Sequence, residues 1–202
     1  MKTIKDLSAD ELADYAFHVF LHSGRHAMGA GLIYRCLELD QYHPLGLRCL
    51  SDFLDWNGSE SVSALVLEYL IDNNLAKTQE SQAELERLLF TCKWVWGFSK
   101  HKSGDTQLSG TEFENEDDFA IDLKGYAQFK QSTFNMAGTW EGVLKGAHNL
   151  IGVYGGVAHS PSLTETHTPV DMLGITDFTA KPEYTEFLGL DTSQLEQVKQ
   201  GG

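Results

Sequence analysis

An internal repeat constrains this chain more than any single motif. The segments Asp10–His43 and Pro44–Lys77 follow each other directly and are equal in length, which gives a period of about 34 residues. Gly24 and Gly58 occupy the same place in the two segments, as expected for a turn that needs an unrestricted backbone. A fixed period of this size is typical of proteins in which one supersecondary unit is stacked repeatedly. We therefore expect two copies of one small unit, packed side by side.

Within each segment the apolar residues recur at the spacing of an α-helix, which predicts helices that bury one face. The first such stripe consists of Leu12, Tyr15, Ala16, Val19 and Phe20. Ser8 and Glu11 have the spacing of a capping box, so the first helix should begin directly after Ser8. His43-Pro44 should separate the second helix from the third, because the residue before a proline avoids the helical conformation.

Small residues and a closing phrase complete the pattern. Gly29 and Ser63 occupy equivalent places in the two segments, and Tyr34-Arg-Cys-Leu-Glu-Leu-Asp40 closes the first. Over Asp10–Lys77 the chain thus resembles the tetratricopeptide repeat (TPR) family, which implies one helix-turn-helix hairpin for each segment. Three residues depart from the family's pattern: Phe17, Gln41 and Leu70. The alternative is an ordinary helical bundle whose period is accidental.

Three stretches of chain follow from this pattern. Residues 1–99 are expected to form a TPR-like helical domain, in which a longer helix from about Gln79 to Trp96 caps the two hairpins. Residues 100–118 read as an acidic linker, and residues 119–202 as a C-terminal segment whose fold the pattern does not define. The expected fold class is mainly α, with helix and irregular structure of the C-terminal segment packed against the hairpins.

The C-terminal segment gives weaker signals. Residues 119–129 show a short apolar alternation that indicates a strand. The apolar residues of Met136–Val157 have helical spacing, although Gly138, Gly142 and Gly146 recur every fourth residue and require either close packing or a non-helical segment. Asp191 is expected to cap a last short helix over Thr192–Val198.

The TPR resemblance also implies a binding groove, lined by the first helix of each hairpin. The residues it places there as partner-binding candidates are Asp14, His18, His22, Arg48, Asp52 and Trp56, accompanied by Glu11, Leu21, Leu45 and Asp55. Chaperone-binding members hold a peptide carboxylate with lysine and asparagine where this chain has Asp14 and His18, so we do not expect that ligand. Acidic and imidazole groups around a single arginine suit a basic or mixed peptide, and Trp56 offers a flat apolar contact. Ion pairing between neighbouring side chains on a solvated face is the alternative role.

Metal binding and catalysis have little support in the sequence. His18 and His22 are four residues apart and share a helix face, a spacing used by two-histidine metal sites, but no HExxH motif surrounds them. We therefore expect no metal ion, no cofactor and no catalytic residue. An enzyme or metal-dependent protein, with its site in residues 119–170 and the repeats as a platform, is the alternative.

The charge of the chain limits its partners. Asp and Glu number 29 against 15 Lys and Arg, a net charge of −14, which repels nucleic acid and anionic membranes. Three unclustered cysteines and the lack of a long apolar run favour a cytoplasmic protein. The sequence thus predicts an adaptor or scaffold that binds a peptide or partner protein, or else its own C-terminal segment.

Overall fold

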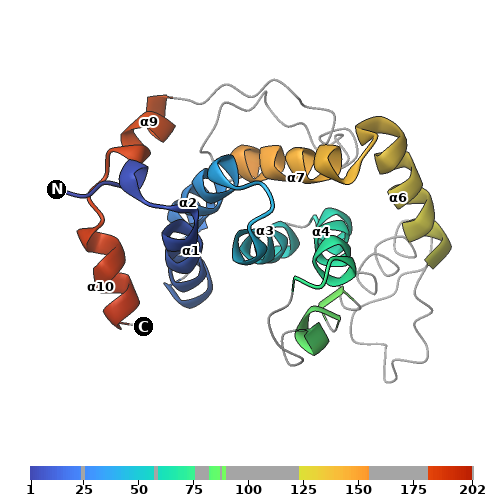
Figure 1. Cartoon of the computed structure of the whole chain (residues 1–202), viewed down its shortest axis with the longest axis horizontal. Helices are drawn as coiled ribbons and strands as arrows, with labels where there is room; N and C mark the ends of the chain where they lie inside the picture. The colour runs from blue at the N-terminus through green and yellow to red at the C-terminus, as the bar shows by residue number, and fades with distance from the viewer. Residues whose placement is uncertain are drawn as a thin grey trace, which may run out of the picture.

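Two helical hairpins form the centre of the molecule. The computed structural model describes residues 1–23, 26–56, 59–75, 82–86, 88–89, 123–154 and 182–201, and these are mainly helical (Figure 1). The first hairpin consists of α1 (Ala9–Ser23) and α2 (His26–Leu39), and the second of α3 (Pro44–Trp56) and α4 (Glu60–Asp72). The second helix of each hairpin begins at an equivalent place, residue 26 in the first repeat and residue 60 in the second. The predicted helical pairs are confirmed, and their spacing follows the period of the sequence.

Local signals explain where these helices begin. The Ser8 amide donates to Oε2 of Glu11 at 2.9 Å, and the Glu11 amide donates to Oγ of Ser8 at 3.2 Å, so the predicted capping box is present. Pro44 is the first residue of α3, where its missing N–H has no helical partner to lose. At the other end of the second hairpin, Asn74 adopts a positive φ of 51° just after α4.

The four helices pack as successive layers. α1 lies against α2 and α3, and α3 lies against α2 and α4. A hydrogen bond joins the two helices of the second hairpin, in which Ser63 Oγ donates to the Ser51 carbonyl oxygen at 2.7 Å. Both serines are buried, and Gly29, the counterpart of Ser63 in the first hairpin, is buried as well. Small buried residues thus stand at equivalent places in the two hairpins, as the sequence pattern predicts. Apolar side chains fill the centre, among them Leu12, Leu32, Ile33, Leu50, Phe53, Leu54, Leu65 and Leu67.

The long helix α7 (Trp140–Tyr154) fastens the second half of the chain to the hairpins. It lies across the hairpin helices and contacts α2, α3 and α4 (Figure 1). The Gln41 amide nitrogen donates to the Glu141 carbonyl oxygen at 3.0 Å. The helix predicted over Met136–Val157 is therefore confirmed for residues 140–154. Of the three glycines spaced four residues apart, Gly142 and Gly146 lie in α7, and Gly138 lies before the helix with a positive φ of 80°.

One expectation is wrong. Residues 123–129, which were expected to lie in a strand, belong instead to the helix α6 (Leu123–Ala137). The buried residues of α6 explain this, because Tyr126, Phe129 and Thr133 follow each other at helical spacing. The apolar alternation that indicated a strand covers only a few residues, whereas the helical spacing of buried residues extends from Tyr126 to Thr133. α6 packs on α7 and on α4. In the contact with α4, Nζ of Lys130 lies 2.6 Å from Oε2 of Glu68.

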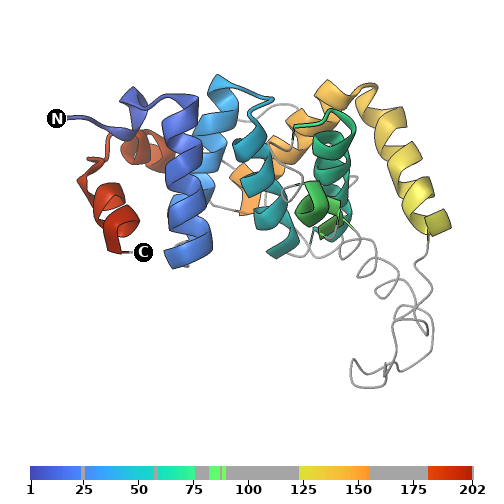
Figure 2. The same ribbon diagram turned by 60° about the horizontal axis from the view of Figure 1, so that its bottom comes forward.

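The last described helices return to the first residues of the chain. α9 (Pro182–Leu188) and α10 (Ser193–Gly201) lie beside the first hairpin, at the end of the molecule opposite α6 (Figures 1 and 2). Between them, Thr3 and Asp191 form an isolated antiparallel bridge. The Asp191 carboxylate accepts a hydrogen bond from the Ser193 amide at 2.9 Å. The first intrahelical bonds are accepted by the Thr192 carbonyl oxygen, so Asp191 lies one residue before the N-cap of α10, which begins one residue later than expected and extends to residue 201.

Several expectations fall outside the described residues. These are the paired glycines Gly24 and Gly58, the acidic linker 100–118, residues 155–170 and most of the expected capping helix. Within that last stretch, residues 82–86 and 88–89 are helical. Among the helices that the structure describes, none combines the length and the apolar character needed to cross a membrane.

Candidate functional site

The candidate binding residues lie on α1 and α3, which pack against each other. On α1, Asp14 and His18 are one turn apart, with 3.7 Å between Oδ1 and Nε2. On α3, Arg48 and Asp52 are also one turn apart, and Nε of the arginine lies 3.2 Å from Oδ2 of the carboxylate. The structure therefore joins these four candidates as two pairs, each within one helix. Their helical spacing puts both members of each pair on the same helix face.

Arg48 also connects α3 to helical residues 82–86, which follow α4 in the chain. Its Nη2 donates to Oε1 of Glu84 at 3.2 Å, while its side chain is only 18% exposed. Burial alone would lower the pKa of Arg48, but Asp52 and Glu84 together raise it. Arg48 thus carries its charge between two carboxylates and holds residues 82–86 against α3. Arg48 therefore forms ion pairs with neighbouring side chains, which the sequence analysis gave as the alternative to partner binding.

Asp52 is a carboxyl group of this face whose surroundings favour its neutral form. Burial raises its pKa from 3.8 to about 6, although the neighbouring Arg48 favours the charged form. The side chain is 17% exposed. Asp52 therefore titrates closer to neutral pH than an exposed aspartate does.

Trp56 stands at the end of α3, one turn beyond Asp52. It is 72% exposed, the largest exposed fraction after that of Met1 among the large apolar side chains that the structure describes. A tryptophan with this exposure presents a broad apolar surface to solvent, next to an acidic helix face. Trp56 is far more exposed than Arg48 and Asp52, the other two partner-binding candidates on α3.

His22 lies in α1, but its side chain is outside the described residues, as is that of Leu21. The expectation that His18 and His22 hold no metal ion therefore stays a prediction from the sequence. Within the part of the chain that the structure describes, no group of three or more His, Cys, Asp or Glu side chains is placed to hold a metal ion.

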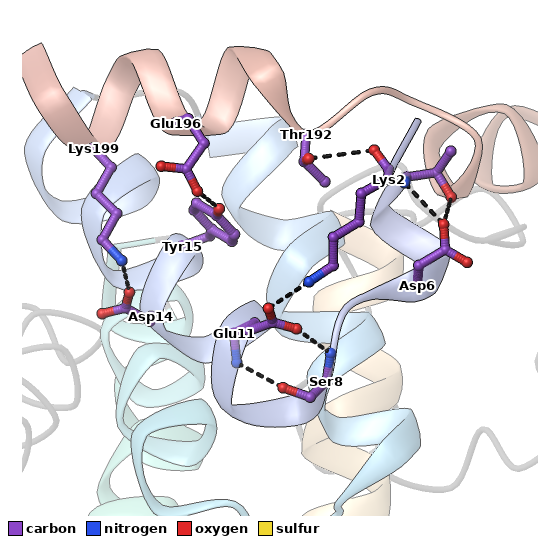
Figure 3. A network of polar contacts seen from close by, with 10 residues as sticks. Lys2, Asp6, Ser8, Glu11, Asp14, Tyr15, Thr192, Glu196 and Lys199 are labelled. Atoms are coloured by element: carbon purple, nitrogen blue, oxygen red, sulfur yellow. Dashed lines mark hydrogen bonds and ion pairs between the residues drawn. The ribbon is translucent and has the colours of Figure 1, made fainter.

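The α1 part of the candidate face is in contact with α10. Lys199 of α10 forms an ion pair with Asp14, and the Tyr15 hydroxyl donates to the Glu196 carboxylate (Figure 3). The Lys199 ammonium also lies 5.3 Å from the centre of the Tyr15 ring. Figure 3 shows both α10 side chains reaching down to α1. One predicted binding residue, Asp14, is thus already occupied by the chain's own C-terminal segment.

A second polar cluster, which sequence reasoning missed, joins α2, α7 and α9. The Tyr184 hydroxyl donates to Oε2 of Glu38 at 2.5 Å, and Nη1 of Arg35 donates to the same oxygen at 3.1 Å. The Tyr34 ring lies between the rings of His148, at 4.3 Å, and Tyr184, at 5.2 Å. These residues come from three helices far apart in sequence, so no spacing pattern connects them.

The chemistry of this cluster is that of a structural contact. Burial lowers the pKa of His148, whose Nε2 lies 2.9 Å from the Tyr34 carbonyl oxygen. The imidazole is therefore neutral at pH 7 and donates this hydrogen bond from Nε2. Burial also raises the pKa of Tyr34 to about 12 and, with the help of Glu38, raises the pKa of Tyr184. Both phenols keep their protons, and the cluster fastens α7 and α9 to α2.

Comparison of the chain with protein-family models, with curated proteins and with solved structures gives no match. A function is therefore argued from the geometry of the described residues.

Proposed function

We propose that this chain is a non-enzymatic protein–protein interaction module, an adaptor or scaffold, built on two TPR-like hairpins. A peptide or partner protein binds along the first helices of the hairpins, α1 and α3. The proposal is supported by the equivalent starting points of α2 and α4 in the two repeats and by the packing of α1 directly on α3. In a stacked repeat, the same side of each unit faces one continuous surface, so residues of α1 and α3 contact one ligand together.

The observation that carries the proposal is the exposed Trp56 on an acidic helix face. Tryptophan is among the residues that contribute most to binding energy at protein interfaces, and one that is 72% exposed is available for such a contact. Asp55 lies next to Trp56, Asp52 is ion-paired with Arg48 on the same helix, and the whole chain has a net charge of −14. The partner segment is therefore basic or mixed in charge, with an apolar side chain that packs on the indole ring. The proposed setting is the cytoplasm.

A single substitution tests this assignment. We expect Trp56→Ala to weaken partner binding by about tenfold or more, since truncation of a hot-spot residue costs well over about 1 kcal/mol. Met136→Ala is the matched control, because Met136 is 45% exposed and lies on α6, away from the proposed surface. Partners captured from cell extract by the tagged full-length chain are identified by mass spectrometry and then titrated against both variants. Equal affinity of the two variants would remove Trp56 from the binding surface and with it the support for this function.

The enzyme alternative, with a site in residues 119–170, stays a prediction. Residues 155–170 lie outside the described part of the chain. Within the described part, the largely buried imidazole of His148 is hydrogen-bonded to α2, which fits a role in holding α7 in place. No observation of the described residues favours this alternative over the binding module.

A further inference from the structure

The contact between α10 and α1 has the features of a ligand seated on a binding surface. Lys199 and Glu196 of α10 are three residues apart, one helical turn, and they reach Asp14 and Tyr15, which are neighbours on α1 (Figure 3). On the same helix, Leu195 is fully buried. α10 thus presents one acidic group and one lysine to α1 and buries one apolar side chain, Leu195, in the core beside them. This is the way in which an amphipathic helix binds to a helical surface.

The segment before α10 is attached more firmly than α10 itself. The Ile4 amide donates to the Leu190 carbonyl oxygen at 3.1 Å, and the Thr192 amide donates to the Lys2 carbonyl oxygen at 3.2 Å. In α9, Phe187 packs flat against Gly31 of α2, where an added Cβ would lie 2.5 Å from the ring. Backbone hydrogen bonds and an inserted ring therefore hold residues 187–192 in place.

α10 itself is held by one buried side chain and by contacts at the surface. Val198 packs on the core in part, and the other residues of α10 are exposed. In the ion pair, Lys199 is 39% and Asp14 is 44% exposed, so salt screens their attraction. Helices as short as the nine residues of α10 are not stable on their own in water. We therefore expect α10 to detach and unfold as one event, while the strand-like contact at Asp191 stays closed.

We propose that the Asp14–Tyr15 surface of α1 is a docking site for an amphipathic helix in a partner, and that α10 is an internal competitor for this site. The partner helix carries a leucine anchor, an acidic residue next to it and a lysine one turn further on, as α10 does with Leu195, Glu196 and Lys199. This inference rests on the proposed function, because Asp14 belongs to the predicted binding residues. It adds which side chains the partner helix carries, and it adds competition by α10 as the means by which partner binding is controlled.

The test uses the full-length chain and a fluorescently labelled peptide of residues 191–202 as the probe. The variant Leu195→Ala/Lys199→Glu releases α10 by removing its anchor and reversing its charge. We expect the peptide to bind the released chain at least tenfold more tightly than the wild type, in which α10 covers the surface. Gln197→Glu is the matched control, since Gln197 is exposed on the same helix, and its affinity for the peptide should equal that of the wild type.

A charge exchange tests the contact itself. In the released chain, Asp14→Lys should abolish binding of the probe, and a peptide with Lys199→Asp should restore it. Circular dichroism establishes that each variant keeps its helical content, and a folded released chain that does not bind the peptide overturns the inference. Equal binding of the peptide to the wild type and to the released chain overturns it as well. If Trp56-dependent partner capture persists in that case, the proposed function stands without the docking site on α1.

Discussion

His148 and Asp52 are two partly buried titratable residues whose contributions to stability change with pH in opposite directions. Burial lowers the pKa of His148 and raises that of Asp52 to about 6, so each favours its neutral form in the folded protein. Neither behaviour follows from residue type. For His148 the cause is the packing of α7 on α2, which brings its imidazole within 2.9 Å of the Tyr34 carbonyl oxygen.

The first prediction concerns His148. Its pKa is 6.5 when unfolded and lower when folded, so its contribution to stability is present above pH 6.5 and is lost as the pH falls through the lowered pKa. We expect His148→Gln, whose amide also donates a hydrogen bond, to lose less melting temperature than the wild type between about pH 7.5 and about pH 5. Thermal unfolding followed by circular dichroism measures this difference. Parallel curves for the two proteins would show that His148 does not titrate in this way.

The contribution of Asp52 to stability changes with pH in the opposite direction. Its pKa is raised when folded, so its contribution to stability is full below about pH 3.8 and is lost as the pH rises through about 6. In Asp52→Asn this loss is absent, and the free energy of unfolding should fall less between about pH 5 and about pH 8 than in the wild type. Urea unfolding at both pH values measures the change. A variant that loses as much stability as the wild type over this range contradicts the raised pKa.

At the level of helices, the sequence predicted features that depend on neighbouring residues, but it did not predict contacts between residues far apart in the chain. The capping box of Ser8 and Glu11 was predictable because both residues lie within one turn. The strand expected near residue 121 was wrong because a short alternation was read in isolation from the helical spacing that begins at Tyr126. The pair Lys199 and Asp14 spans 185 residues of sequence, so periodicity gave no sign of it.

The turn between α6 and α7 provides a test at this level. Gly142 lies in the first turn of α7, where an added Cβ would lie 2.2 Å from the Ala137 carbonyl oxygen. Alanine favours a helix by about 1 kcal/mol over glycine, but a clash with backbone costs more than that gain. We expect Gly142→Ala to lower the free energy of unfolding in urea by about 1–3 kcal/mol.

The matched control for this substitution is Gly201→Ala in α10, whose Cβ would have no atom within 4 Å. It should change the free energy of unfolding by less than about 0.5 kcal/mol. A Gly142→Ala variant as stable as this control would mean that the turn rearranges without cost.

For the whole molecule, the equal length of the two repeated segments predicted the order and pairing of the first four helices. The same pattern placed Asp14 and His18 on α1, and Arg48 and Asp52 on α3, but it did not give their partners. The pair of Arg48 and Asp52 is foreseeable from a spacing of four residues, whereas the bond from Arg48 to Glu84 depends on how two helices pack. The sequence therefore predicted which helices carry these residues, whereas the ion pair between Arg48 and Glu84 depends on the tertiary structure; their role in binding stays a prediction.

Hydrogen exchange of the full-length chain, measured by mass spectrometry with and without a captured partner, tests the central claim most directly. The account predicts slower exchange over residues 9–23 and 44–56, which form α1 and α3, together with faster exchange over residues 193–201 as α10 is displaced. Slower exchange confined to residues 123–137 of α6, with α1, α3 and α10 unchanged, would contradict it.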